Sequence, residues 1–275
     1  MKRKIGIIGF GNMGSAIGQR LKAAGYQIVV FDKDKNKTKS LEGLKVAKNI
    51  TDAIKQTDVV ILAIKPQDFD SVLGQIKGYV QDKLIVSIAA GITTGYMEKI
   101  LGKVKIIRAM PNIGVKIAEA QTCLCKGRNA EDQDLYFVQQ LFDEVGKTWV
   151  IKEEMIDAAT AISGSGPAYI YYDMEIKKIN PLNVSEKIKQ GYIDRLKAAA
   201  EKVSFNSEIA MDLTVSTLGT SLHLARVMLP AELIKLITSK GGTTEAALQV
   251  LAKGGSWEEA ALAAKKRAEE LSKKE

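Results

Sequence analysis

The sequence predicts an α/β fold: an N-terminal doubly wound parallel sheet followed by an all-α C-terminal domain. Three observations predict it. Short apolar runs alternate with helical patterns up to about residue 152, as in parallel sheets that are covered on both faces. A glycine-rich turn follows the first of these runs, and from Lys152 onward helical patterns dominate. We therefore expect a dinucleotide-binding domain over 1–152 and a helical domain over 153–275.

Composition limits the classes of function. The net charge is +8, but the basic residues are scattered, so a lysine-rich surface is favoured over nucleic-acid binding. No apolar run reaches the ~20 residues that span a bilayer, and glycines interrupt the first run, so we expect a cytoplasmic protein without membrane contact. Cys123 and Cys125 are expected to be reduced thiols on one strand face, and no metal site is predicted because no histidine lies near them.

The first apolar run, 4–8, leads into Gly9, Gly11 and Gly14, and a helix is predicted over about 12–24. This G-x-G-x-x-G turn between a strand and a helix is typical of a Rossmann-type fold. Gly9 permits the turn, Gly11 lets a pyrophosphate approach, and Gly14 lets the helix pack on the strand. The free N–H groups at the helix start would then face the phosphates.

The choice of dinucleotide depends on the end of the second strand, predicted over 26–31. Asp32 follows this strand. In dinucleotide-binding folds a carboxylate about 20 residues after the glycines hydrogen-bonds the ribose hydroxyls, and Asp32 is close to that position, which favours NADH. Lys33, Lys35 and Lys37 come next and could hold the 2′-phosphate of NADPH, or could simply begin a solvated helix. The sequence leaves the cofactor as NADPH or NADH.

The remaining strands complete one sheet. They are predicted over 44–47, 58–64, 84–88, 104–108, 121–126 and 147–151, with a helix over 131–144 before the last. Ligands of open α/β sheets bind outside the carboxyl ends of the strands. The turns at 9–14, 63–67, 89–91 and 109–112 are therefore expected to line one crevice.

The helical half is predicted to break at Pro181, at 204–207, at Pro230 and at 241–242. Asn183 followed by Glu186 predicts an N-cap with a capping box. The small residues of 209–224 predict a helix inside a bundle or a dimer interface, and 261–275 is expected to be a charged, exposed helix.

Two polar loops are candidates for chemistry. The loop 238–244 could bind a carboxylate at a helix N-terminus, or Thr243 or Thr244 could be an ordinary N-cap. The loop 163–169 offers serines, but His223 is the chain's one histidine and the spacing is not that of a nucleophile elbow, so a hydrolase is disfavoured. Hydride transfer from a cofactor requires fewer acid–base side chains of the protein, and a hydroxyl such as that of Thr244 could polarise a carbonyl or an imine.

Five motifs coincide in order, and together they make the chain resemble the pyrroline-5-carboxylate reductase family along nearly its whole length. They are G-F-G-N-M-G at 9–14, A-I-K-P-Q at 63–67, R-A-M-P-N at 108–112, S-G-S-G-P-A-Y at 163–169 and G-G-T-T at 241–244. The resemblance implies NAD(P)H-dependent reduction of 1-pyrroline-5-carboxylate, a cyclic imine carboxylate, to L-proline in the last step of proline biosynthesis. It also implies a homodimer or larger homo-oligomer formed through the C-terminal helices.

The resemblance assigns site residues by motif. Thr244 would hydrogen-bond the imine nitrogen. The substrate carboxylate would be bound by Ser239, Gly241, Gly242 and Thr243. The cofactor would be held by Ile8, Gly9, Phe10, Gly11, Asn12, Met13, Ala63, Ile64, Lys65 and Pro66, with Met110, Pro111 and Asn112 beside the nicotinamide.

Several departures from the family pattern keep alternatives open. Lys240 replaces a proline, Ile113 replaces a threonine, and an acid expected near 227–229 is absent. The stretch 175–195 is longer than the family needs, and we expect it to alter the subunit contacts or the mouth of the site. A related cyclic-imine reductase, a β-hydroxyacid-type dehydrogenase (which would want a catalytic lysine, for which Lys240 is nearest) and a nucleotide-binding protein without turnover remain alternatives.

Overall fold

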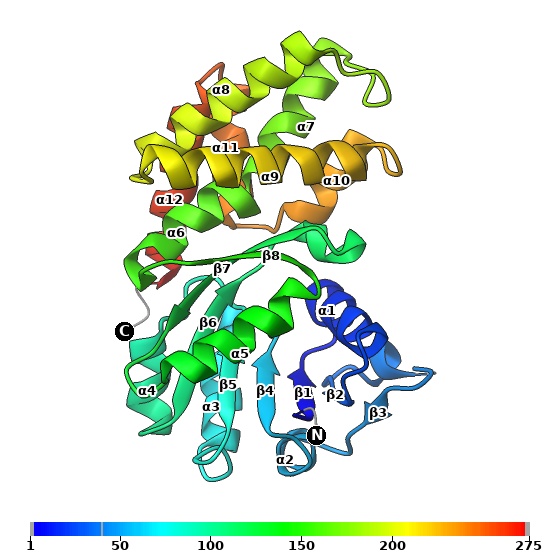
Figure 1. Cartoon of the computed structure of the whole chain (residues 1–275), viewed down its shortest axis with the longest axis vertical. Helices are drawn as coiled ribbons and strands as arrows, with labels where there is room; N and C mark the ends of the chain where they lie inside the picture. The colour runs from blue at the N-terminus through cyan, green and yellow to red at the C-terminus, as the bar shows by residue number, and fades with distance from the viewer. Residues whose placement is uncertain (1–2, 40, 273–275) are drawn as a thin grey trace. The chain divides into compact units, whose positions relative to one another are not determined.

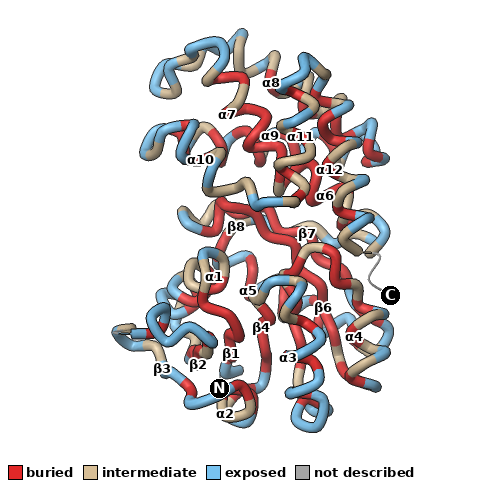
Figure 2. Tube along the Cα trace, turned by 180° about the vertical axis from the view of Figure 1, so that it is seen from behind, coloured by how far each residue is buried: buried red, intermediate tan, exposed pale blue. Residues whose placement is uncertain are grey.

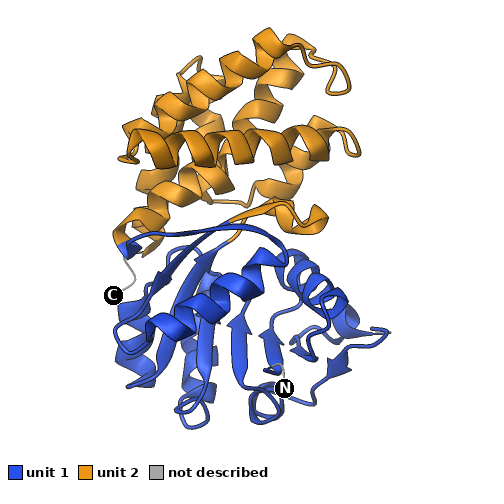
Figure 3. Ribbon diagram, viewed as in Figure 1, with its two compact units in different colours: residues 1–110, 122–153, 275 blue, residues 111–121, 154–274 orange. Residues whose placement is uncertain are grey.

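A computed structural model of the chain describes residues 3–39 and 41–272. These residues form two compact units (Figure 3). Unit 1 comprises 3–110 and 122–153, and unit 2 comprises 111–121 and 154–272. The predicted division at 152/153 differs from this one chiefly because the segment 111–121 clusters with the helices. The physical reason is that this segment hydrogen-bonds to the helical half: Asn112 donates to the Ser163 carbonyl, Gln121 donates to the Thr220 hydroxyl, and that hydroxyl donates to the Glu119 carbonyl.

Unit 1 contains one eight-stranded sheet of order β3-β2-β1-β4-β5-β6-β7-β8 (Figure 1). Its strands are β1 (Ile5–Ile8), β2 (Ile28–Phe31), β3 (Lys45–Val46), β4 (Val59–Leu62), β5 (Leu84–Ser87), β6 (Lys105–Met110), β7 (Ala120–Lys126) and β8 (Gly146–Val150). The first six are parallel, and β7 pairs with β6 in the antiparallel sense. The order 3-2-1-4-5-6 is that of a doubly wound dinucleotide-binding sheet, so the predicted Rossmann-type fold is confirmed.

The helices of unit 1 cover both faces of this sheet, with α1 and α5 on one face and α3 and α4 on the other (Figures 1 and 2). They are α1 (Asn12–Ala23), α2 (Ile50–Lys55), α3 (Phe69–Ile76), α4 (Thr94–Leu101) and α5 (Asp132–Asp143). All four residues of β1, of β4 and of β5 are buried. This double cover explains why these strands read as continuous apolar runs rather than as alternating ones.

Unit 2 is helical, as predicted. Its helices are α6 (Ile156–Ala159), α7 (Gly166–Lys177), α8 (Glu186–Lys202), α9 (Ser207–Ala225), α10 (Pro230–Ile237), α11 (Thr243–Ala252) and α12 (Trp257–Ser272). Trp257 is almost completely buried, stacks on Tyr192 at a centroid distance of 5.7 Å and meets the edge of Tyr169 at 6.0 Å. These aromatic contacts join α7, α8 and α12 into one core.

Two local expectations in unit 2 were wrong. The helix after Pro181 begins at Glu186 and is capped by Ser185, whose hydroxyl accepts from the Ile188 N–H, rather than by Asn183. The last helix is charged but not simply exposed, because α12 buries a face of alanines at 260, 261, 264 and 268. Among the described residues, no helix is long and apolar enough to cross a membrane.

Candidate functional site

The glycine-rich turn follows β1 and begins α1. Gly9 has a φ of +94°, and a Cβ there would lie 2.4 Å from the Ala63 carbonyl oxygen. A Cβ on Gly14 would lie 2.1 Å from the Gly9 carbonyl oxygen, whereas one on Gly11 would meet no atom within 4 Å. Gly9 and Gly14 are therefore required for the fold of the turn, and Gly11 leaves open space in front of the first N–H groups of α1. A phosphate could approach the backbone there.

A cavity of about 500 Å³ lies in unit 1 beside this turn. Seven of the predicted cofactor residues line it: Ile8, Gly9, Gly11, Asp32, Ala63, Ile64 and Lys65. Four more, Phe10, Asn12, Met13 and Pro66, lie within two positions of these residues in the chain but do not line the cavity. The cavity also borders Gln67, which belongs to the predicted turn 63–67, and residues that sequence reasoning did not select, such as Ser71 and Gln75, because α3 begins directly after β4 and its connecting turn.

Asp32 is only 8% exposed, and its carboxylate is held by the backbone. One oxygen accepts the Phe10 N–H at 2.7 Å, and the other accepts the Asp34 N–H at 2.8 Å. The ammonium of Lys37 lies 3.6 Å from the first oxygen. Asp32 thus ties the glycine-rich turn to the end of β2, a role that its distance from the glycines in the sequence does not reveal.

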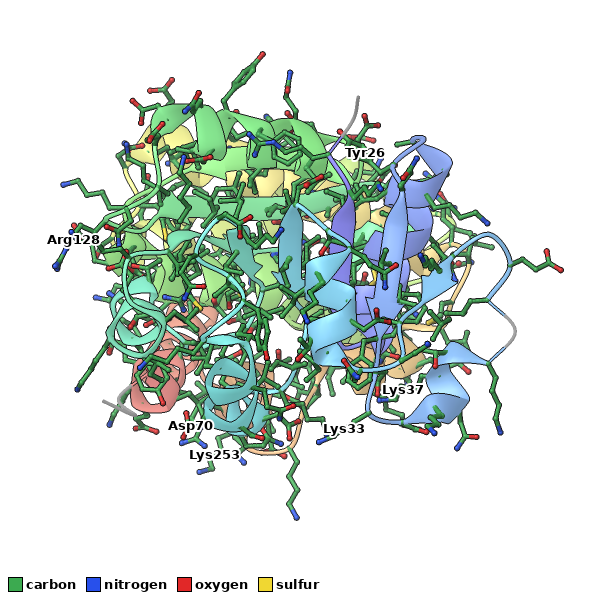
Figure 4. All side chains as sticks on the ribbon, turned by 90° about the horizontal axis from the view of Figure 1, so that it is seen from below. Tyr26, Lys33, Lys37, Asp70, Arg128 and Lys253 are labelled. Atoms are coloured by element: carbon green, nitrogen blue, oxygen red, sulfur yellow. The ribbon has the colours of Figure 1, made fainter. Side chains whose placement is uncertain are left out.

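Lys33 and Lys37 line the same cavity and come from the segment that follows β2, and Figure 4 labels both side chains. The Lys33 ammonium is 2.7 Å from a carboxylate oxygen of Asp68, and the Lys37 ammonium is near Asp32. Both side chains are well exposed, so their charges are available to an anionic group at the rim.

In unit 2, the loop 238–242 is fixed by its own backbone. The Gly242 N–H donates to the Ser239 carbonyl at 2.9 Å, and Gly241 has a φ of +70°. The Gly241 N–H donates to a carboxylate oxygen of Glu245 at 2.7 Å, and the Arg267 Nε donates to the Gly241 carbonyl at 2.7 Å. Gly242 is the N-cap of α11, so the alternative in which a threonine caps this helix is wrong.

Three hydroxyl groups meet at the start of α11. The Ser165 Oγ lies 3.1 Å from the Thr243 Oγ1 and 3.1 Å from the Thr244 Oγ1. Thr244 is 4% exposed and Ser165 is completely buried. The predicted substrate residues Ser239, Gly241, Gly242 and Thr243 and the predicted catalytic Thr244 are thus close together in one loop and helix start. Ser165 is an addition that sequence reasoning missed, although its motif had been singled out.

Asn112 is 3% exposed, and all of its side-chain hydrogen-bonding groups are used within unit 2. Its Oδ1 accepts the N–H groups of Gly114 at 3.0 Å and Gln121 at 3.1 Å. Its Nδ2 donates to the Gln121 Oε1 at 2.6 Å and to the Ser163 carbonyl at 2.9 Å. The amide therefore closes the segment 111–121 on itself and attaches it to the π-helical turn Thr160–Gly164 before α7, whose last residues were predicted to begin a loop. The predicted place of Met110, Pro111 and Asn112 beside the nicotinamide stays a prediction.

Comparison with known proteins identifies the family of this chain. Residues 4–91 match the family model described as NADP oxidoreductase coenzyme F420-dependent, and residues 191–271 match the one described as pyrroline-5-carboxylate reductase dimerisation. A pyrroline-5-carboxylate reductase of Methanosarcina acetivorans is 31% identical over 284 residues, which covers 99% of each chain. The chain belongs to the pyrroline-5-carboxylate reductase family.

Solved structures agree with this family assignment. A pyrroline-5-carboxylate reductase from Coxiella burnetii matches with a TM-score of 0.67 and 30% identity, over 99% of this chain and 100% of that one. The Plasmodium falciparum pyrroline carboxylate reductase with NADP bound matches with a TM-score of 0.65 and 27% identity, over 98% of each chain. The resemblance carried by the five motifs is confirmed, and the reductase is an NAD(P)H-dependent oxidoreductase of proline biosynthesis.

Proposed function

We propose that this chain reduces 1-pyrroline-5-carboxylate to L-proline, with unit 1 holding NAD(P)H and unit 2 holding the imine. The observation that carries the proposal is the buried Thr244 hydroxyl, placed at the start of α11 next to a polar glycine loop. A small cyclic substrate with one carboxylate and one imine nitrogen needs those two features: an anion site and a hydroxyl that can hydrogen-bond the nitrogen.

The residues of unit 1 fit the cofactor. Gly11 leaves a space that a Cβ would fill, and the N–H groups at the start of α1 are available to a pyrophosphate. Ile8 to Met13 and Ala63 to Pro66 would hold the dinucleotide, and Met110, Pro111 and Asn112 would flank its nicotinamide. Reduced NAD(P)H would supply the hydride that adds to the imine carbon.

The loop of unit 2 would bind the substrate carboxylate. Because the Gly241 and Gly242 N–H groups already donate to Glu245 and to the Ser239 carbonyl, these two glycines shape the loop more than they donate to the ligand. The N–H groups of Thr243 and Thr244 belong to the first turn of α11, where helical geometry provides no internal acceptor. Together with the Ser239 hydroxyl they form the proposed carboxylate site, and the exposed Lys240 adds positive charge to its rim.

Thr244 would act on the nitrogen. As the C=N bond is reduced, its π electrons move onto the nitrogen, and water supplies the proton that completes the amine. A hydrogen bond from the Thr244 hydroxyl to the nitrogen strengthens as this charge develops, so it stabilises the transition state more than the bound substrate.

The matched dimerisation model supports a homodimer formed through the C-terminal helices. The exposed apolar side chains of Met211 and Val215, one turn apart on α9, give such an interface a surface to bury. A mass measurement in solution by light scattering tests this, and a monomeric mass would contradict it. The cytoplasmic location also stays a prediction, and cell fractionation would test it.

The test of the function is loss of nicotinamide absorbance with 1-pyrroline-5-carboxylate, run with NADH and with NADPH. Thr244→Val keeps the side-chain shape and removes the hydroxyl. Since a hydrogen bond to a group that gains charge contributes about 1.5–3 kcal/mol, we expect kcat to fall about 10- to 100-fold. Thr244→Ser, which keeps a hydroxyl, is the matched control and should retain most of the activity.

The outcomes separate the alternatives. Proline formed by the unsubstituted chain, with the expected loss in Thr244→Val, supports the proposal. If the chain binds the cofactor and reduces another cyclic imine but not this one, then the departures at Lys240 and Ile113 have redirected the site, and the proposed substrate is wrong. If the cofactor binds and no imine is reduced, the protein is a nucleotide binder.

A further inference from the structure

We propose that Ser165 is a positioning residue, whose buried hydroxyl orients the hydroxyl of Thr244 toward the substrate nitrogen. This inference rests on the proposed function. Its basis is the pair of 3.1 Å contacts that the Ser165 Oγ makes with the hydroxyl oxygens of Thr243 and Thr244. Ser165 is 79 residues from Thr244 in the chain, so only the packing of unit 2 brings these groups together.

The backbone around Ser165 is held in place independently of its side chain. Residues Thr160–Gly164 form one turn of π-helix between α6 and α7, and the Ser165 N–H donates to the Thr160 carbonyl at 2.9 Å. The Tyr169 hydroxyl donates to the Ala161 carbonyl at 2.8 Å and fixes the same turn from inside the core. Single π-helical turns within α-helices are often found at functional sites. Here the residue that follows is Ser165.

The number of hydroxyl protons decides the direction of the hydrogen bonds. Each of the three hydroxyls has one proton to donate. A neutral imine nitrogen is an acceptor, so Thr244 must donate its one proton to the substrate, and in its hydrogen bond with Ser165 it must then be the acceptor. The consistent arrangement has Thr243 donating to Ser165, Ser165 donating to Thr244, and Thr244 donating to the nitrogen. If the direction were reversed, the Thr244 proton would point to Ser165 and would be lost to the substrate.

This chain of donors has two effects on Thr244. It keeps the Thr244 hydroxyl rotor in the orientation that hydride transfer requires, which the weaker hydrogen bond to the bound substrate does not enforce by itself. It also polarises the Thr244 O–H bond, which strengthens the hydrogen bond to the nitrogen as that atom gains charge. Both effects act mainly in the transition state, so we expect removal of the Ser165 hydroxyl to lower kcat and to leave KM for the imine nearly unchanged.

The neighbouring Ser163 provides a matched control. It is also completely buried and lies two residues away in the same motif. Its hydroxyl donates to the Ala159 carbonyl at 2.9 Å, an interaction within the preceding turn. Loss of the Ser163 hydroxyl therefore tests the cost of removing a buried serine hydroxyl from this segment without removing a partner of Thr244.

The experiment is a double-mutant cycle with 1-pyrroline-5-carboxylate and NADPH, using Ser165→Ala, Thr244→Val and the pair. We expect Ser165→Ala to lower kcat about 3- to 10-fold, the range of one neutral hydrogen bond. We expect the pair to be no slower than Thr244→Val alone, because Ser165 acts through the hydroxyl that Thr244→Val removes. NADPH affinity, measured by fluorescence, should be unchanged, and Ser163→Ala should keep its kcat.

Three results would overturn the assignment. If Ser165→Ala matches the unsubstituted chain, the hydroxyl has no role in turnover. If the two substitutions multiply in the pair, Ser165 acts independently of Thr244. If Ser163→Ala loses as much kcat as Ser165→Ala, the loss reflects packing of the segment. Absence of turnover by the unsubstituted chain would overturn the proposed function and the assignment with it, whereas the first three results leave the proposed function intact.

Discussion

Replacing Gly11 or Gly14 by alanine should separate cofactor binding from folding within one turn of the chain. A Cβ on Gly14 would lie 2.1 Å from the Gly9 carbonyl oxygen, well inside the 3.0 Å that real Cβ contacts respect. That neighbour is backbone, so the start of α1 must move away from Gly9 by close to 1 Å. Overpacking of this kind destabilises by about 1–3 kcal/mol. At about 2–4 °C per kcal/mol for a chain of this size, we expect Tm to fall by about 3–10 °C.

Gly11→Ala should behave in the opposite way. Its Cβ would meet no atom within 4 Å, and Gly11 has a φ of −76° and a ψ of −161°, which alanine adopts without strain. We therefore expect Tm to change by no more than about 1–2 °C, since such a substitution stays within about 0.5 kcal/mol. The methyl group fills the space through which a pyrophosphate would approach the first N–H groups of α1. Loss of one or two hydrogen bonds to a charged group would raise the Kd of NADPH by about 10- to 100-fold.

The assay is thermal unfolding for Tm and NADPH fluorescence for Kd, measured on both variants and on the unsubstituted chain. A variant Gly11→Ala that unfolds as early as Gly14→Ala would show that the open space is filled in solution. A Gly11→Ala protein that binds NADPH as tightly as the unsubstituted chain would show that the pyrophosphate does not approach this turn. Either result would refute the reasoning from the glycine geometry.

Three further predictions concern the cofactor rim and the two thiols. Lys37→Ala should lower kcat/KM for NADPH about three- to tenfold and leave kcat/KM for NADH nearly unchanged. The Lys37 ammonium lies at the same cavity as Lys33 and would pair with the 2′-phosphate, which NADH lacks. Equal losses with both cofactors would contradict this. Burial raises the pKa of Cys123 and of Cys125 to about 12, so neither thiol should react with iodoacetamide at pH 8 until the protein unfolds. The pKa of each thiol is higher in the folded than in the unfolded protein. Below about pH 8.5 the thiols are protonated in both states and leave the free energy of unfolding unchanged. Between about pH 8.5 and pH 12 the free energy of unfolding should fall, because the thiols of the unfolded protein ionise first. Urea unfolding at pH 8 and pH 10 measures this, and equal free energies of unfolding would refute it.

Much of the fold can be predicted from short segments of the sequence. The apolar runs at 5–8 and 59–62 predict buried parallel strands because both faces of each strand are covered. The glycine turn predicts its own geometry, because backbone sterics at Gly9 and Gly14 depend on atoms only a few residues away or on the adjacent strand. Motifs of this kind are sufficient to predict a Rossmann-type domain followed by helices.

What the sequence leaves undetermined depends on contacts between residues that are distant in the chain. Asn112 reads as part of a motif after a strand, but its amide is used by Gln121 and by the Ser163 carbonyl, so the segment 111–121 belongs to unit 2. The sequence predicts Asp32 at the end of β2 as a ribose ligand, and that role stays a prediction; only the structure shows that two backbone N–H groups also hold its carboxylate against the turn.

The candidate site divides in the same way. The motif G-G-T-T places Thr244 at a helix start from the sequence alone, because a polar glycine turn followed by helical periodicity is a local signal. The partner of its hydroxyl, Ser165, is determined only when α7 and α11 pack together, since a hydroxyl carries no sequence signal of what it will bond. The sequence by itself therefore determined the fold class, the cofactor turn and the position of Thr244. The tertiary structure alone decided which distant groups orient these residues, because hydrogen bonds over such separations exist only after the core has formed.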